Sequence, residues 1–231
     1  MRYLKDQKTK SRKKVNRLRG KKILVTAGPT REKIDPVRFL SNMSTGKMGY
    51  AIAESLAEKG AIVTLISGPV ALSINHPDIK VIKVTSAREM YEQSVLIFPD
   101  CDAAILSAAV SDYTPVKEFD RKIKREKDIL YIELKPTDDI AETLGRMKKE
   151  EQVLVGFALE SDNEIRNAVK KIKKKNLDFI VLNSLRDKGA GFGTDTNLIT
   201  IIDRNNNIEK FELKPKKEVS IDIINRLEEY F

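Results

Sequence analysis

The sequence predicts an α/β protein with a central, mainly parallel sheet that is flanked by helices. Three observations predict this class. Apolar runs of strand length recur along the 231 residues, stretches of helix length separate them, and most of the runs are apolar on both faces. Strands that are buried on both faces and alternate with helices are typical of parallel sheets. The expected arrangement is Rossmann-like, with a flap after the fourth strand and a C-terminal β-hairpin and helix.

Six apolar runs are the predicted strands of this sheet, and five segments are the predicted helices. The strands are expected at Ile23–Ala27, Ala61–Ser67, Lys80–Val84, Ala103–Ala108, Val153–Ala158 and Phe179–Leu182. The helices are expected at Gly46–Lys59, Ala87–Phe98, Asp138–Lys149, Asn163–Lys175 and Val219–Tyr230.

Two further segments interrupt this alternation. Tyr113–Pro136 follows the fourth strand, is too long for a simple connection and contains the strand-like segment Ile129–Leu134. Because long excursions at strand ends commonly cover ligands, we expect it to be the flap. Near the C-terminus, Leu198–Asp203 and Ile208–Leu213 flank the turn Arg204–Asn207, and this pattern predicts the hairpin.

Basic residues are concentrated at the start of the chain. Residues 1–22 hold eleven Lys and Arg and one acid, and because the whole chain has a formal net charge of +9, the remainder is nearly neutral. We therefore expect residues 1–20 to be a basic linker or leader and residues 21–231 to be the globular domain. An arm that binds nucleic acid or a membrane surface is the alternative. A general nucleic-acid binder would instead spread its basic residues over a folded face.

The composition excludes several kinds of site. With one cysteine, Cys101, and one histidine, His76, the chain has neither the two cysteines of an internal disulfide nor the ligands of a zinc cluster. The apolar runs are too short for a spanning helix, and the first residues are too polar for a signal peptide. We expect a cytoplasmic protein without a membrane partner. Its chemistry must depend on Lys, Asp, Asn, backbone amides and a bound ligand.

The most informative stretch is Thr26–Glu54, which follows the first predicted strand. It lacks GxGxxG, and GKMG at Gly46–Gly49 lacks the P-loop spacing, so neither a standard dinucleotide site nor a Walker-type phosphate cradle is indicated. Ser44 and Gly46 precede the expected helix and suit a phosphate or carboxylate, unless the serine only caps the helix. Asn42 can both donate to and accept from a carbonyl or carboxylate, or it is an ordinary turn residue.

The fourth strand and the flap carry the next candidates. Ala108 and Ala109 are small and leave room for a base or a sugar at the end of the strand. Asp112 can receive a ribose hydroxyl or help to hold magnesium, or it caps the next turn. In the flap, Lys122 and Lys124 lie on one side of an extended segment and can contact phosphates, unless they are simply solvated.

Two later positions complete the set of candidates. Lys171 and Lys175 are one helical turn apart and can contact one anion, or they only offset the helix dipole. Phe157, at the end of the fifth strand, can stack on a base or pack in the core.

Taken together, TAGPTRE, DPVRFLSNMSTGKMG, SAAVSDY, the KIK of the flap and VGFALE resemble phosphopantothenoylcysteine synthetase, the ligase of coenzyme A biosynthesis. The resemblance covers about Lys21–Phe231. The SNMSTGKMG segment is similar to the bacterial and archaeal type that uses CTP rather than ATP. The resemblance implies that CTP and Mg²⁺ activate the carboxylate of 4′-phosphopantothenate as an acyl-cytidylate, with release of pyrophosphate. The amine of L-cysteine then attacks this intermediate.

The same resemblance implies roles for individual residues. Catalytic roles are implied for Asn42, which handles the acyl-cytidylate, and for Lys122 in the flap. Nucleotide contacts are implied at Leu106, Ser107, Ala108, Asp112, Lys122, Asp138, Asp139, Ile140, Ala141, Phe157, Lys171 and Lys175. Substrate contacts are implied at Arg38, Asn42, Ser44, Gly46 and Ala109, while Mg²⁺ is carried mainly by the CTP phosphates.

The sequence departs from the family pattern in two places. The flap has Arg125 where the family commonly has lysine, which preserves the charge. The segment KPTDDIA is one residue longer than the usual loop, which leaves the assignments at Asp138–Ala141 uncertain by one position.

The resemblance also implies partners. We expect a homodimer, and a flavin-dependent decarboxylase that is either fused to the synthetase or a separate partner. The basic leader then resembles the former linker to that decarboxylase. Two other functions stay open on the sequence alone: a dehydrogenase with a degenerate nicotinamide site, and a nucleic-acid-binding module that uses the leader.

Overall fold

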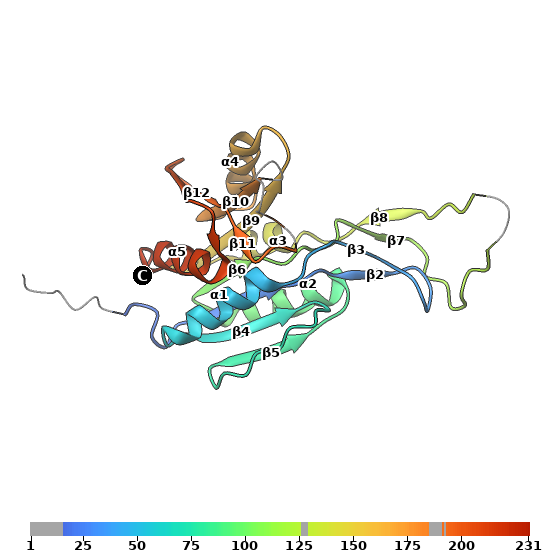
Figure 1. Ribbon diagram of the computed structural model, residues 1–231, viewed down its shortest axis with the longest axis horizontal. Coiled ribbons are helices and arrows are strands. Elements are labelled where there is room, and N and C mark those ends of the chain that lie inside the picture. Colours follow the sequence, from blue (N-terminus) through green and yellow to red (C-terminus); the bar gives the residue numbers. More distant parts are fainter. Residues whose placement is uncertain (1–15, 126–128, 185–190, 192) are drawn as a thin grey trace, which may run out of the picture.

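The computed structural model describes residues 16–125, 129–184, 191 and 193–231. Its centre is an eight-stranded sheet with the order β13-β12-β10-β9-β6-β1-β4-β5 (Figure 1). The six strands from β10 to β5 in this order are parallel to one another, whereas β12 and β13 are antiparallel additions at one edge. The strands are β1 (Lys22–Ala27), β4 (Ile62–Ser67), β5 (Ile79–Lys83), β6 (Ala103–Leu106), β9 (Val153–Glu160), β10 (Phe179–Ser184), β12 (Thr200–Asp203) and β13 (Ile208–Lys210).

Helices cover both faces of this sheet. Because side chains alternate between faces along a strand, Ile23 and Val25 of β1 belong to one apolar cluster and Leu24 to the other. Helices α1 (Lys47–Glu58) and α5 (Lys216–Glu228) pack on the first cluster. Helices α2 (Ala87–Ile97), α3 (Ile140–Met147) and α4 (Glu164–Lys174) pack on the second, together with the short 3-10 helix η1 (Phe98–Asp100).

An arm of two short β-ribbons extends from one end of the sheet (Figure 1). One ribbon pairs β2 (Arg31–Lys33) with β3 (Phe39–Ser41), and the other pairs β7 (Tyr113–Pro115) with β8 (Leu134–Pro136). The second ribbon is the base of the predicted flap. A further small pair, β11 (Thr196–Asn197) with β14 (Lys214–Pro215), lies just before α5.

The predicted strands of the sheet, the terminal hairpin and all five helices are confirmed, with ends that differ by a few residues. The strand-like segment Ile129–Leu134 does not form a strand as a whole, because only its last residue belongs to β8 and residues 129–133 have no regular structure. Most of its apolar residues are exposed, Tyr131 by 83%, so that no core face fixes them in a strand.

The globular domain begins earlier than the predicted residue 21. Leu18 is fully buried in the cluster beneath α1 and α5. The Asn16 side-chain amide donates to the Lys59 carbonyl over 2.7 Å, and the Gly20 amide donates to the Gly60 carbonyl over 2.8 Å. The last five residues of the predicted leader therefore pack on the domain. Residues 1–15 of that leader lie outside the described residues. In the part of the chain that is described, every helix is too short or too polar to cross a membrane.

A buried carboxylate, Asp178, connects several segments of the domain just before β10. Its Oδ2 accepts from the Leu154 amide over 2.7 Å and from Lys148 Nζ over 2.8 Å, and both side chains of this ion pair are over 90% buried. Its Oδ1 accepts from Arg204 at 2.7 Å. Removing one partner of a buried pair leaves the other charge without compensation.

We expect Asp178→Ala to lower the free energy of unfolding by about 3–5 kcal/mol, because Lys148 stays buried without its partner. Urea unfolding followed by circular dichroism measures the change. Glu92→Ala, which removes an exposed pair with Arg88, is the control and should cost less than about 1 kcal/mol. Equal losses in the two variants would show that the Asp178 pair contributes no more than a surface pair.

Candidate functional site

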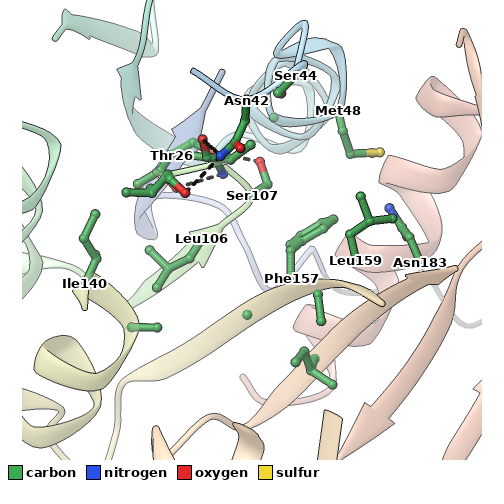
Figure 2. Close-up of a pocket in the computed structure, with 18 of the residues that line it drawn as sticks. Thr26, Asn42, Ser44, Met48, Leu106, Ser107, Ile140, Phe157, Leu159 and Asn183 are labelled. Carbon is green, nitrogen blue, oxygen red and sulfur yellow. Dashed lines mark hydrogen bonds between the residues drawn. The ribbon is translucent and has the colours of Figure 1, made fainter. Parts of the chain in front are cut away.

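A cavity of about 510 Å³ opens at the carboxyl ends of the parallel strands (Figure 2). The strand order reverses there, because the chain proceeds from β1 outward to β4 and β5 and then returns to β6 on the other side of β1. Thr26 of β1 and Leu106 of β6 line the cavity at this reversal. Ligands of open α/β sheets bind at such switch points.

The N-terminus of α1 forms one wall of the cavity. Gly46 precedes the helix with a φ of 78°, a left-handed conformation that glycine adopts without strain. No side chain caps the helix; the Ser44 hydroxyl instead accepts from the Gly46 amide at 3.3 Å. Gly49 allows α1 to approach the sheet, since a Cβ there would lie 2.5 Å from that of Ala27. The alternative in which Ser44 only caps the helix is therefore not observed, and the helix terminus remains available to an anion.

Asn42 lines the cavity beside this terminus, and the segment that follows β6 holds its side chain (Figure 2). Its side-chain nitrogen donates to the carbonyls of Ala109 and Val110 over 3.0 and 3.1 Å. Both amide hydrogens are thereby used, and Oδ1 is the side-chain atom that can accept from a ligand. The contacts therefore fit an acceptor role for Asn42.

Two lysines, Lys171 in α4 and Lys175 at its C-terminal end, also line the cavity. Lys171 Nζ lies 2.5 Å from Glu160, and Lys175 Nζ lies 2.8 Å from Asp139. Burial of Asp139 and Glu160 opposes their ionisation, but the hydrogen bonds and charges of the groups around them, led by these lysines, together outweigh it, and the pKa of each carboxyl is lowered. Each lysine thus pairs with its own carboxylate.

The cavity brings together most of the residues that the sequence singled out. Phe157 is partly buried and packs against the core, as one of its two predicted alternatives requires, and it also lines the cavity, where stacking on a base stays a prediction. The predicted residues that line the cavity are Asn42, Ser44, Gly46, Leu106, Ser107, Ala108, Ala109, Asp112, Asp138, Asp139, Ile140, Ala141, Phe157, Lys171 and Lys175.

Arg38 and Lys122 are not among the lining residues, although both were predicted to contact ligands. They lie on the arm, where the buried carboxylate of Asp35 connects their two segments. Asp35 Oδ2 accepts from Arg38 Nε at 3.0 Å and from the Ile123 amide at 3.1 Å, and Arg38 donates to the Ile123 carbonyl at 2.7 Å. The Arg38 guanidinium holds the pKa of Asp35 far below its usual range. Arg38 and the loop that carries Lys122 therefore form one unit.

Asp35→Asn should separate these two segments, because a neutral amide no longer holds the guanidinium and the Ile123 amide together. We expect hydrogen exchange of the loop around Ile123 to become faster on the order of tenfold. Hydrogen-exchange mass spectrometry of the arm measures this. Glu118→Gln, which removes a 3.9 Å surface pair with Lys33 on the same arm, is the control. Unchanged exchange in Asp35→Asn would show that the contacts do not hold the loop.

Several lining residues were not predicted. Asn183 directly follows a predicted parallel strand, a position that signals a ligand contact at this edge of the sheet. Lys47, Asn197 and Lys216 also line the cavity, and no pattern in the sequence connects the last two, from distant segments, to this site.

Comparison with known proteins agrees with this fold. The family model described as "DNA/pantothenate metabolism flavoprotein C-terminal domain" matches residues 18–230. A "Cysteine/Cysteine sulfinic acid decarboxylase" from an unknown prokaryotic organism is 58% identical over 94% of the chain and 61% of its own length. The coenzyme A biosynthesis bifunctional protein CoaBC of Bacillus subtilis is 46% identical over 91% of the chain and 52% of its own length.

The chain therefore spans only about half to three fifths of these relatives. A crystal structure of the C-terminal domain of a CoaBC protein is 42% identical and superposes with a TM-score of 0.77, covering 93% of this chain and 97% of that domain. The fold, the cavity at its switch point and the match over residues 18–230 place the chain in the family of the DNA/pantothenate metabolism flavoprotein C-terminal domain.

Proposed function

We propose that this chain is a phosphopantothenate–cysteine ligase of coenzyme A biosynthesis that activates its substrate with CTP. The carrying observation is the cavity at the switch point, which combines Asn42, an uncapped helix terminus and the nucleotide-contact positions on β6, α3 and α4. Membership of a family whose 46% identical relative is named for coenzyme A biosynthesis supports the same activity.

In the first half-reaction, the carboxylate of 4′-phosphopantothenate attacks the α-phosphorus of CTP, and pyrophosphate leaves as the bond to the β-phosphate breaks. The nucleoside is bound between Phe157, the α3 start and Lys175, and Asp112 receives a ribose hydroxyl. The uncapped α1 terminus and Lys122 stabilise the phosphates.

Magnesium fits this proposal as a companion of the nucleotide. Within residues 16–125, 129–184, 191 and 193–231, no group of three or more His, Cys, Asp and Glu side chains is arranged to hold a metal ion. The CTP phosphates would therefore supply most of its ligands. The ion supplies charge neutralisation on those phosphates.

In the second half-reaction, the cysteine amine attacks the acyl carbon, the bond from that carbon to the phosphate oxygen breaks, and CMP leaves. Asn42 Oδ1 accepts a hydrogen bond from the attacking amine and directs its lone pair to the carbonyl. The two carbonyls that hold the Asn42 amide fix this orientation. The proton that the amine loses passes to solvent.

A homodimer is part of the proposal. The arm exposes apolar side chains, among them Val37 by 60%, Ile129 by 77% and Tyr131 by 83%. Large exposed apolar patches are typical of interaction surfaces, and we propose that these side chains contribute to one. Because Arg38 and Lys122 belong to this arm and not to the cavity wall, we infer that each arm serves the cavity of the second copy. A decarboxylase, fused or separate, is the proposed further partner, because the relatives are longer than this chain.

The test is pyrophosphate release with 4′-phosphopantothenate, comparing CTP with ATP in the presence of Mg²⁺, with and without L-cysteine. We expect release with CTP and formation of the amide product only when cysteine is present. Equal turnover with ATP would contradict the CTP assignment. Carbon dioxide release from cysteine or cysteine sulfinic acid, the activity named for the 58% identical relative, is assayed in parallel, as is NADH binding. Carbon dioxide release or NADH binding in the absence of pyrophosphate release would contradict the proposed ligase activity.

A further inference from the structure

Lys216, the first residue of α5, contributes a buried ammonium group to the cavity wall. The residue is 7% exposed. Its Nζ donates to the Gly191 carbonyl at 3.2 Å and also to the Thr194 carbonyl. An ammonium group has three donors, so two carbonyls leave one donor for a ligand.

The charge of Lys216 distinguishes it from the other lysines of the cavity. Lys47, Lys171 and Lys175 each pair with a carboxylate at 2.5–2.8 Å. Among the residues that the structure describes, no carboxylate lies within 4 Å of Lys216 Nζ. Burial lowers the pKa of Lys216, and repulsion from Lys47 lowers it further. Attraction to Asp195 raises this pKa but does not cancel the other two effects. A buried charge with only neutral partners is costly unless a ligand compensates it.

The position of Lys216 indicates the kind of ligand. Asp195 places Lys216 near the N-terminus of α1, whose amides no side chain caps. The Asp195 carboxylate pairs with Lys47 at 2.5 Å, and the Asp195 carbonyl accepts from the Lys216 amide over 2.9 Å. Ile140 lies at one end of the cavity, and Met48 of α1 and Asn183 lie at the other (Figure 2). The α1 end thus combines an uncapped helix terminus with a cation whose charge is not neutralised, and a phosphate group suits both.

We propose that Lys216 binds a phosphate group of a substrate in this cavity. The proposal rests on the proposed function, which brings two phosphate-bearing molecules here. One source is the terminal phosphates of CTP, and the other is the phosphomonoester of 4′-phosphopantothenate. On binding, the third ammonium donor contacts a phosphate oxygen, and the anion supplies the countercharge that the protein lacks at this point.

The experiment compares Lys216→Met with Lys217→Met. Lys217 is the next residue, but it is more exposed and pairs with Glu54 and Glu58 on α1. Isothermal titration calorimetry measures the dissociation constants of CTP, CMP, 4′-phosphopantothenate and pantothenate. We expect Lys216→Met to raise the dissociation constant of CTP or of 4′-phosphopantothenate at least about tenfold. The dissociation constant of the matching ligand that lacks the phosphate, CMP for CTP or pantothenate for 4′-phosphopantothenate, should change by less than about twofold. Lys217→Met should change none of them beyond about twofold.

The pairs of ligands separate a phosphate contact from a structural role. If Lys216 only anchored the carbonyls of Gly191 and Thr194, its loss would weaken both members of a pair equally or neither, and either result overturns the proposal. Lys216→Gln keeps an amide donor for these carbonyls and takes the same test if the Met variant does not fold. If the wild-type protein binds CTP and 4′-phosphopantothenate and the Lys216 variants bind all four ligands with unchanged dissociation constants, only the role of Lys216 is contradicted. If the wild-type protein binds neither CTP nor 4′-phosphopantothenate, the proposed function is contradicted as well.

Discussion

Asn42→Asp is expected to allow formation of the acyl-cytidylate but to stop its conversion into the amide, so that the intermediate accumulates on the enzyme. The carboxylate cannot donate to the carbonyls of Ala109 and Val110, which hold the wild-type side chain. It would also stabilise the cysteine amine as an ammonium group, which has no lone pair for attack. Misplacing an attacking group typically costs on the order of 10² in rate.

The measurement is a quenched reaction with CTP, 4′-phosphopantothenate and cysteine, analysed by mass spectrometry for the cytidylate. Asn225→Asp makes the same chemical change on α5, where the side-chain oxygen only accepts from Lys59 at 3.1 Å, and it should leave turnover unaltered. Product formation at the parental rate by Asn42→Asp would refute this role, as would absence of the cytidylate while CTP still binds.

Lys122→Gln is expected to slow acyl-cytidylate formation at least tenfold, which corresponds to about 1.4 kcal/mol of transition-state stabilisation or more. The reason is that a neutral amide cannot offset the charge on the departing pyrophosphate. Single-turnover pyrophosphate release measures the rate. Lys117→Gln, on the same arm and next to Phe119, is the control and should be without effect. An unchanged rate in Lys122→Gln would mean that the lysine is only a solvated charge.

The same two variants test whether the arm acts on the second copy. In a mixed dimer of Asn42→Asp and Lys122→Gln chains, one cavity has a wild-type Asn42 and receives Lys122 from the other chain. Mixing the two impaired proteins should then raise the rate to up to about a quarter of that of the wild type, because half of the dimers are mixed and one of their two cavities is intact. If each arm served its own cavity, mixing would restore nothing.

The sequence predicted the sheet well because its strands are apolar on both faces, and burial alone places such runs in the interior. It did not predict the ribbon of β2 and β3, whose residues REK and FLS lack an alternating apolar pattern. Polar contacts with a distant segment hold β2 instead: the Arg31 amide donates to the Thr85 carbonyl over 2.8 Å, and buried Glu32 accepts from the Ala87 amide over 2.9 Å. At Ile129–Leu134 the pattern is strand-like, but no core face fixes it in a strand. Local pattern also failed at Leu18, a single apolar residue among charged neighbours that is nevertheless fully buried.

The candidate site divides in a similar way. Residues within continuous motifs, such as Asn42 and the α1 start, could be identified from the sequence because their neighbours in the chain are also their neighbours in space. The link between Asp35 and Ile123 joins residues 88 positions apart, and no local pattern reports it. Lys216 was missed for the same reason, since the topology alone brings α5 against α1.

The packing of α5 on α1 affects how the protein is made. The first helix of the domain packs against the last, and Ser55 and Ser220 share a buried hydrogen bond of 2.7 Å across this interface. A growing chain on the ribosome therefore leaves the side of α1 that α5 covers exposed until the final residues have emerged. The cavity gains Lys216 only at that moment, so a chain released a few dozen residues early would have most of the sheet and no finished site.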